Sequence, residues 1–457
     1  MADSQRSPAP IVETTRLRTD TRHVLVAAGV FVLTLVLSII IGNFGPLVQK
    51  RNQGVRSRKY FNVIDGDFDN MYRTEINSMI PEHQMVWLNC YIKRPESYDN
   101  KDKKHFQLVF EVSAWGMRGD KTHRLANNRI YAHTVTCLPN KRWCKPVPLW
   151  AQNVVLYPEY LVHAELVHAE DTFPDAVITT KMYIGFINRE FTSFAMGWYY
   201  LCLAITLLVL FTPRLGFGYR LLQSPPNAWS IEQRWTLALL VGLVFLYDHP
   251  LLAGVIYSGH KNVATALAVV YIYSAFAFVG ILLLHFLSLV HDLQFGRERH
   301  KQTVMRVGVS VVVCGAIAAF GATTNVFNRL RNAREPSFAD FGMQHVLKTT
   351  QCALIFFVTV YIVWFAVEAA KALKLIVAMP HHGKLLFFLS VGTLGSMLTA
   401  IFVGAFDTAA QTPLVFVVFT VIPNLYVWTL AYLLSPLDVN KGAAPMLGGA
   451  TDLQLML

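Results

Sequence analysis

The sequence predicts a polytopic α-helical membrane protein in which a signal-anchor helix and a seven-helix bundle flank an inserted antiparallel β-sandwich. Three observations predict this class. Of the 457 residues, 54% are hydrophobic and only 15% are charged, whereas about a quarter of the residues of a soluble domain are charged. Eight apolar runs reach the roughly 20 residues needed to cross a bilayer. Between the first two runs lies a polar segment, 47–193, which is too long for a connecting loop.

The apolar runs define the order of the predicted segments. The spans are 24–44, 194–212, 235–257, 264–290, 304–322, 350–370, 385–405 and 414–434. They divide the chain into an N-terminal tail (1–23), a first membrane segment (24–46), the sandwich domain (47–193), a seven-helix domain (194–436) and a short C-terminal tail (437–457). The first span is interpreted as a retained signal anchor, because it is longer than a usual signal peptide core and no small-x-small cleavage site follows it. A cleaved signal peptide is the alternative.

Basic residues in the short loops predict that both chain termini lie in the cytosol, because cytosolic loops are enriched in lysine and arginine. They gather in the N-terminal tail and after the second, fourth and sixth spans, as Arg6, Arg16, Arg18, Arg22, Arg214, Arg220, Arg234, Arg297, Arg299, Lys301, Arg306, Lys371, Lys374 and Lys384. The segment 323–349 is the exception, being basic on the opposite side. The sandwich domain is then lumenal or extracellular. The net charge of +11 reflects loops facing anionic lipid, and nucleic acid is not expected as a partner.

Within 47–193 the hydrophobic period changes from helical to alternating. "FQLVFEVSAWGM" (106–117) and "KMYIGFINREF" (181–191) place apolar residues on one face, namely Phe106, Leu108, Phe110 and Val112 in the first and Met182, Ile184 and Phe186 in the second. "QMVWLNCYIKR", "RIYAHTVTCL" and "YLVHAELVHAE" add similar stretches, separated by Pro, Asn and Gly. Short half-buried strands at this spacing predict an antiparallel sandwich. Residues 51–84 are less regular, and a helix is an option there.

Three of the six cysteines, Cys90, Cys137 and Cys144, fall in this domain. In an oxidising lumen, the loop "CLPNKRWC" predicts a disulfide between Cys137 and Cys144. Three cysteines allow three single bridges, so the other pairings stay open.

"HAELVHAE" (163–170) looks like a metal site, but strand alternation separates its two His-Glu pairs onto opposite faces. No metal and no cofactor are therefore predicted.

The third span raises a specific question, because "EQRWTLALLVGLVFLYDHPLL" (232–252) holds Asp248, His249 and Pro250 in an apolar run. A charged group in a membrane is costly and should face the bundle interior or an aqueous cavity. Proline removes a backbone donor and leaves a carbonyl to be satisfied by other groups. Either Asp248 and His249 cap a kinked helix near the lumenal boundary, or they line a lumen-facing vestibule.

A lipid-accessible cavity in the bundle would make Asp248, His249 and Asn424 the candidate polar groups around its mouth. Small residues in 307–322 and 390–405, beside aromatic residues in the fourth and sixth spans, would leave room for an acyl chain. The alternative is that the small residues let helices pack closely.

Four motifs occur in order through the bundle: "EQRW…LL…LVFLYDHP", "HDLQFGRERHK" (291–301), "FGMQHVLKTTQCALIFFVTVYIVWFAVEAAKALK" and "NLYVWTLAYLLSP" (424–436). This series resembles the Wntless-like family, nearest the branch that contains transmembrane protein 181. The resemblance implies a Golgi-dynamics (GOLD-like) sandwich on a receptor-like bundle, in Golgi, endosomal or plasma membranes. The short tail and the divergent sandwich depart from Wntless itself, so its lipid-modified cargo does not transfer.

The expected function is that of a trafficking or cargo receptor, binding a lumenal protein or a lipid-modified ligand, in contact with membrane lipid. A cytosolic sorting or signalling partner would meet the basic loops. One alternative is a signalling receptor coupled to a G protein, although no aspartate-arginine-tyrosine-like signature is present. Another is an ion channel or transporter. An enzyme is not expected, because the histidines lack the spacing of a zinc-dependent membrane hydrolase.

Overall fold

The computed structural model of the chain describes residues 21–47, 49–52, 60–62, 71–94, 104–139, 141–152, 154–169, 177–213, 216–226, 229–295, 300–332, 341–374, 381–406 and 413–436. The predicted tail 437–457 and residues 1–20 of the N-terminal tail lie outside this set. So do the loop residues Arg214, Arg297 and Arg299.

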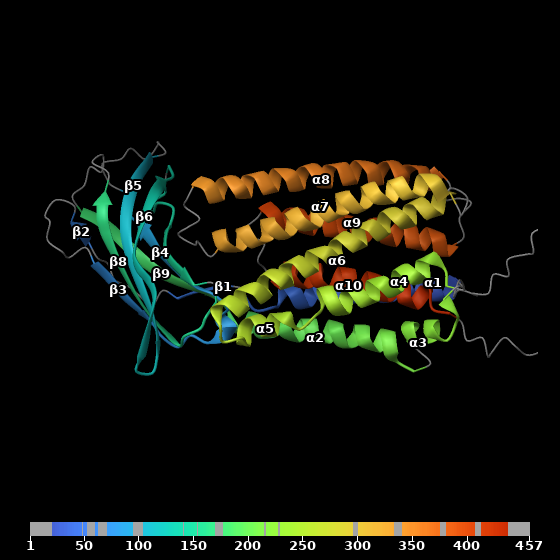
Figure 1. The fold of residues 1–457 in the computed structure, drawn as a ribbon, viewed down its shortest axis with the longest axis horizontal. Helices are drawn as coiled ribbons and strands as arrows, with labels where there is room; N and C mark the ends of the chain where they lie inside the picture. Colours follow the sequence, from blue (N-terminus) through green and yellow to red (C-terminus); the bar gives the residue numbers. More distant parts are fainter. Residues whose placement is uncertain are drawn as a thin grey trace, which may run out of the picture.

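The helices run side by side as a bundle, and the strands form a separate layer at one end of it (Figure 1). The helical bounds are α1 Thr21–Asn43, α2 Arg189–Phe211, α3 Phe217–Leu222, α4 Ile231–Gly242, the π-helix η3 Leu243–Tyr247, α5 Leu251–Tyr257, α6 Lys261–Phe295, α7 His300–Asn332, α8 Phe341–Lys374, α9 His381–Phe406 and α10 Pro413–Leu433. α4, η3 and α5 follow one another as a single broken span. The short helix α3 was not predicted.

Seven segments of the described chain are long and apolar enough to cross a membrane, namely α1, α2, the α4–η3–α5 segment, α6, α7, α8 and α10. The eighth predicted span, 385–405, corresponds to α9, whose described apolar stretch is the shorter Gly383–Leu398. The chain is therefore a multi-pass membrane protein, as predicted. α2 begins at Arg189, before the predicted 194, because Asn188 caps it by accepting a hydrogen bond from the Glu190 N–H.

The basic segment 323–349 is mostly helical, which differs from the loop that the sequence suggested. α7 continues to Asn332 and α8 starts at Phe341, so both helices extend beyond their predicted spans. Figure 1 shows these extended ends directed toward the strand layer.

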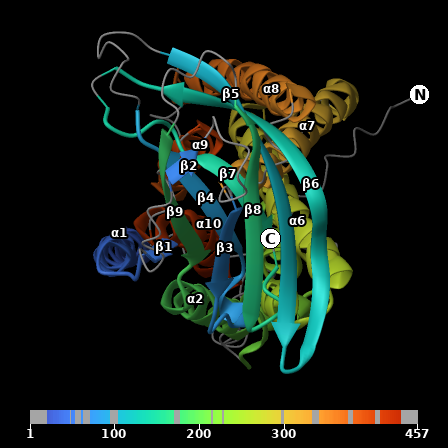
Figure 2. The ribbon, with the colours of Figure 1, turned by 90° about the vertical axis from the view of Figure 1, so that its left-hand side faces the viewer.

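The strands form two antiparallel sheets (Figure 2). Their bounds are β1 Gln49–Asn52, β2 Tyr60–Asn62, β3 Met71–Ile76, β4 Val86–Ile92, β5 Lys104–Arg118, β6 Lys121–Cys137, β7 Val147–Gln152, β8 Glu159–Ala169 and β9 Val177–Ile187. One sheet has the order β1-β9-β4-β7, with β2 also paired to β9, and the other has the order β3-β8-β5-β6. A 3₁₀ turn, η1 (Pro81–His83), joins β3 to β4.

A single apolar core lies between the two sheets, with Leu88 of β4, Phe106 and Phe110 of β5 and Tyr160 of β8 among its buried members. The alternation predicted for 106–117 is confirmed, because Phe106, Leu108, Phe110 and Val112 are all buried. The described part of 51–84 forms strands and the turn η1 in place of the optional helix. The sequence patterns missed β1, β2, β3 and β7.

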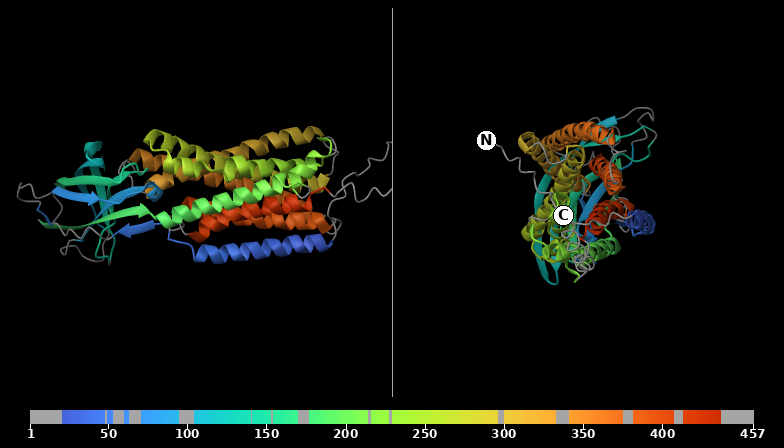
Figure 3. Two further views of the ribbon diagram at one scale, coloured as in Figure 1. Left: turned by 90° about the horizontal axis from the view of Figure 1, so that it is seen from below. Right: turned by 90° about the vertical axis from the view of Figure 1, so that its right-hand side faces the viewer.

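α1 packs along α10 at the side of the bundle (Figure 3). The contact is close at its end, because a Cβ added at Gly42 would stand 2.7 Å from the Cα of Leu414. Only glycine allows two backbones to approach this nearly. Gly29, nearer the start of α1, meets nothing within 4 Å, so an added side chain there has open space.

Candidate functional site: two facing helix defects

α10 is the most deeply buried membrane helix of the described part of the chain, and it carries Pro423 in its interior. Proline has no N–H, so the carbonyl four residues earlier, that of Phe419, loses its helical donor. Tyr247 supplies a replacement, because its hydroxyl donates to the Phe419 oxygen at 2.7 Å. A side chain from another span thus satisfies the carbonyl that the proline leaves open.

The donor Tyr247 itself comes from a second defect, in the broken third span. α4 ends at Gly242 and widens into η3, after which the Asp248 N–H bonds to the Leu243 carbonyl at 2.7 Å. The next residues, His249 and Pro250, precede the new helix α5. One-turn π segments and prolines are recognised causes of helix kinks. This break turns the side chains of Tyr247 and Asp248 toward α10.

Asp248 and Asn424 form the central polar contact of the bundle. Oδ1 of Asp248 accepts a hydrogen bond from Nδ2 of Asn424 at 3.0 Å, and the same amide donates to the Thr420 carbonyl at 3.0 Å. Both residues are 0% exposed. Asn424 stands 11 residues after Pro413 and nine before Leu433, so about 14–17 Å of helix separates it from either end. The pair therefore lies inside the bundle, and a cavity with these residues around its mouth stays a prediction.

His249, the third predicted residue, does not join this pair. Its Nε2 lies 2.6 Å from Oγ of Ser274 on α6, and Ser274 donates in turn to the Tyr271 carbonyl at 3.0 Å. The Tyr271 hydroxyl donates to that of Tyr199 on α2 at 2.6 Å. The two polar side chains at the break therefore contact different helices, since Asp248 bonds to α10 and His249 bonds to α6.

A second buried polar cluster lies farther from the sandwich and was missed by the sequence patterns. The Tyr426 hydroxyl lies 3.0 Å from Nε2 of His285 on α6 and 2.8 Å from Oγ of Ser390 on α9. All three residues are buried. A histidine within an apolar span, and a tyrosine two residues after Asn424, were the available signals. Among the described residues, no group of three or more His, Cys, Asp or Glu side chains could hold a metal ion.

Some small residues of α7 pack against a neighbouring helix, whereas others are exposed. A Cβ at Gly321 would come within 2.7 Å of the Phe276 ring on α6, and one at Gly280 of α6 would lie 3.2 Å from Ala318. Close packing accounts for these positions. Gly315 is exposed and meets nothing within 4 Å, so it is not an interior wall.

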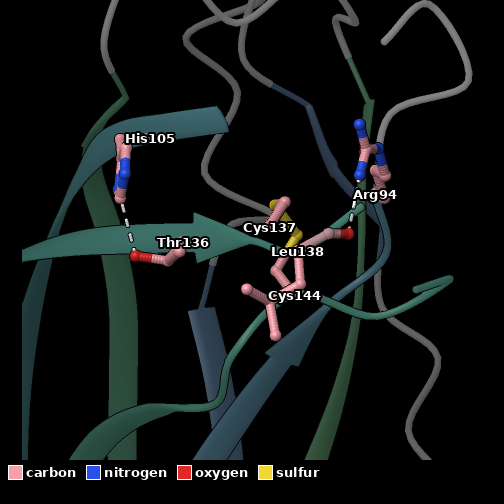
Figure 4. The surroundings of a disulfide bond; sticks show 6 residues. All are labelled: Arg94, His105, Thr136, Cys137, Leu138 and Cys144. Atoms are coloured by element: carbon pink, nitrogen blue, oxygen red, sulfur yellow. Dashed lines mark hydrogen bonds between the residues drawn. A yellow bond between two sulfur atoms is a disulfide. The ribbon is translucent and has the colours of Figure 1, made fainter. Parts of the chain in front are cut away.

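Within the sandwich, the structure pairs Cys137 with Cys144 and leaves Cys90 as a buried free thiol. Figure 4 shows the clipped loop beside Arg94, whose Nη1 donates to the Leu138 carbonyl at 2.7 Å. Burial raises the pKa of the Cys90 thiol, which keeps it protonated and weakly nucleophilic.

Comparison with known proteins separates the helices from α2 onward from the sandwich that precedes them. The family described as "Wntless-like, transmembrane domain" matches residues 188–438, from the α2 cap to just beyond α10. Human transmembrane protein 181 is 22% identical over 437 residues, covering 91% of this chain and 86% of the human protein.

Proposed function

Because the chain belongs to the Wntless-like family, we propose that it is a trafficking receptor of secretory or endosomal membranes. In this role the sandwich and the bundle together bind a lumenal protein or a lipid-modified ligand. The basic loops favour an orientation with the sandwich in the lumen and both termini in the cytosol. Cytosolic sorting partners would then meet the loops at the opposite end.

The junction between the sandwich and the bundle is the observation that carries this proposal. The turn η1 projects from the sandwich onto α2 and α5. The Tyr257 hydroxyl of α5 donates to Oε1 of Glu82 at 3.1 Å, and Nε2 of Gln84 donates to Oγ1 of Thr192 on α2 at 2.9 Å. Gln84 has φ 55°, a conformation uncommon outside glycine and frequent at functional positions. The turn is therefore held against two helices at once.

The junction has a second tie, at the residue that caps α2. Nδ2 of Asn188 donates to the Leu47 carbonyl at 2.8 Å, which joins the exit from α1 to the entry into α2. Both chain connections to the sandwich thus meet at one buried side chain. A ligand on the sandwich would act on α2 and on α5, the helix that resumes after the Pro250 break.

Proximity labelling tests this function. A peroxidase placed at the exposed Gly119–Asp120 turn, compared with one fused after residue 436, should label two different sets of proteins. The first set should contain secreted proteins and the second set cytosolic sorting proteins. Labelling of cytosolic proteins from the Gly119–Asp120 turn would overturn the orientation, and a first set without secreted proteins would overturn the cargo role.

A further inference from the structure

We propose that the bundle binds one monovalent alkali cation, of which sodium is the probe, between Asp248 and Asn424. This site is independent of the trafficking role, because it rests on the bundle interior alone.

The first argument is the pair of oxygen atoms that the Asp248–Asn424 contact leaves over. Nδ2 of Asn424 donates one hydrogen bond to Asp248 Oδ1 and one to the Thr420 carbonyl. Oδ2 of Asp248 and Oδ1 of Asn424 are buried, and neither has a hydrogen-bond partner among the described residues. Native structures rarely leave buried polar atoms unsatisfied. While the Asp248 carboxyl is ionised, the two acceptors cannot satisfy each other, so they require a positive ion or a donor from another group.

The second argument is that three nearby polar groups are bonded to other atoms. The Tyr247 hydroxyl donates to Phe419, and Nε2 of His249 is held at Ser274. Trp428, four residues after Asn424 on α10, donates its indole N–H to the Thr206 hydroxyl of α2 at 3.0 Å. These three polar groups therefore leave the two oxygens unsatisfied.

The third argument is charge. Among the described residues, no basic side chain forms an ion pair with Asp248, in contrast to Glu75 with Arg73 and Glu368 with Lys371. An isolated buried carboxylate is strongly unfavourable unless it takes up a proton or a counter-charge accompanies it. One negative charge matches a cation of charge one. A calcium ion would leave an excess positive charge beside the single carboxylate.

The ligand chemistry fits a hard cation. Carboxylate and amide oxygens are the ligands that such ions prefer. At the break, Pro250 has no N–H to donate to a backbone carbonyl. Irregular backbone inside a membrane protein is tolerated where such groups find partners.

The test uses the full chain in lipid nanodiscs, with its Tm measured in sodium chloride and in choline chloride at equal ionic strength and pH. A cation that binds only the folded state stabilises it by RT ln(1 + c/Kd) at free concentration c, so the Tm should rise with the logarithm of the sodium concentration above the Kd, and should not respond to choline. Asp248→Asn should abolish the sodium response. This variant should fold, because its new amide can donate to Oδ1 of Asn424. Glu368→Gln removes another buried carboxylate and serves as the control that keeps the response.

Binding of radioactive sodium to the wild-type protein makes the test independent of the variants. Saturable binding that excess unlabelled sodium displaces and choline does not would support the site. The proposal is overturned if the wild-type Tm is the same in both salts, or if Asp248→Asn keeps the sodium response. A Tm that changes with pH and ignores sodium would assign the site to a proton and would also overturn it.

Discussion

The Tyr247 hydroxyl donates to the carbonyl oxygen of Phe419, the one that Pro423 deprives of its helical donor. Tyr247 can reach it because its own helix is broken just before Pro250. The broken third span thus supplies the donor that the proline defect of α10 requires, and one further residue along each helix gives the Asp248–Asn424 contact. An apolar span retains a carboxylate here because its partner stands on the facing helix.

This compensation predicts the outcome of a double-mutant cycle. Tyr247→Phe should lower the free energy of unfolding by about 1–3 kcal/mol, because it leaves a buried carbonyl unsatisfied. In a Pro423→Ala background the helix regains its own donor, so the same change should cost much less. Denaturant unfolding of the four proteins measures the coupling. Equal losses in both backgrounds would show that Tyr247 and Pro423 act separately.

Removing one partner of the Asp248–Asn424 pair should cost more than removing both. Asn424→Leu leaves the carboxylate without its amide donor and should destabilise the fold by about 1.5–3 kcal/mol. The double variant Asp248→Leu/Asn424→Leu removes the buried charge as well, and should recover much of that loss. Thermal unfolding in nanodiscs compares them. A double variant less stable than the single one would contradict the pairing.

The close contact of α1 with α10 predicts a position-specific effect of side-chain size. Gly42→Leu should separate the two helices, because its Cβ would collide with the backbone at Leu414. Gly29→Leu is the matched control on the same helix, where space is open. Cysteine crosslinking between α1 and α10 should fall in the first variant and persist in the second. Equal crosslinking in both would rule out tight packing at Gly42.

The cysteines of the sandwich should differ in their reactivity. Because burial raises the Cys90 pKa, a maleimide should not label Cys90 in the native protein at pH 7, and raising the pH to about 9 should add little. Of the three sandwich cysteines, unfolding without reductant should expose Cys90 alone to the reagent, whereas Cys137 and Cys144 should require reduction as well. Mass spectrometry identifies the labelled residues. Native labelling of Cys90, or labelling of Cys137 without reductant, would contradict this pairing.

Local patterns predicted the membrane spans and the longest strands, because length, composition and alternation are properties of contiguous residues. The buried face of β5, with Phe106 and Phe110, followed directly from alternation. Contacts between distant segments were not predictable in the same way. Asp248 and Asn424 are 176 positions apart in sequence. Both were named from the sequence as candidate polar groups, but the hydrogen bond between them was not predicted. The cluster of His285 was missed for the same reason, since Tyr426 and Ser390 reach this histidine only after folding.

A quantitative comparison of the proteins secreted by cells with and without this protein tests the receptor function most directly. A defined set of secreted proteins should be retained in secretory membranes when the protein is absent, and re-expression of the wild type should restore their release. A variant that breaks the junction through Glu82→Ala and Gln84→Ala, expressed at the same level, should restore it less well. Secretion that is unchanged without the protein would contradict the role as a trafficking receptor.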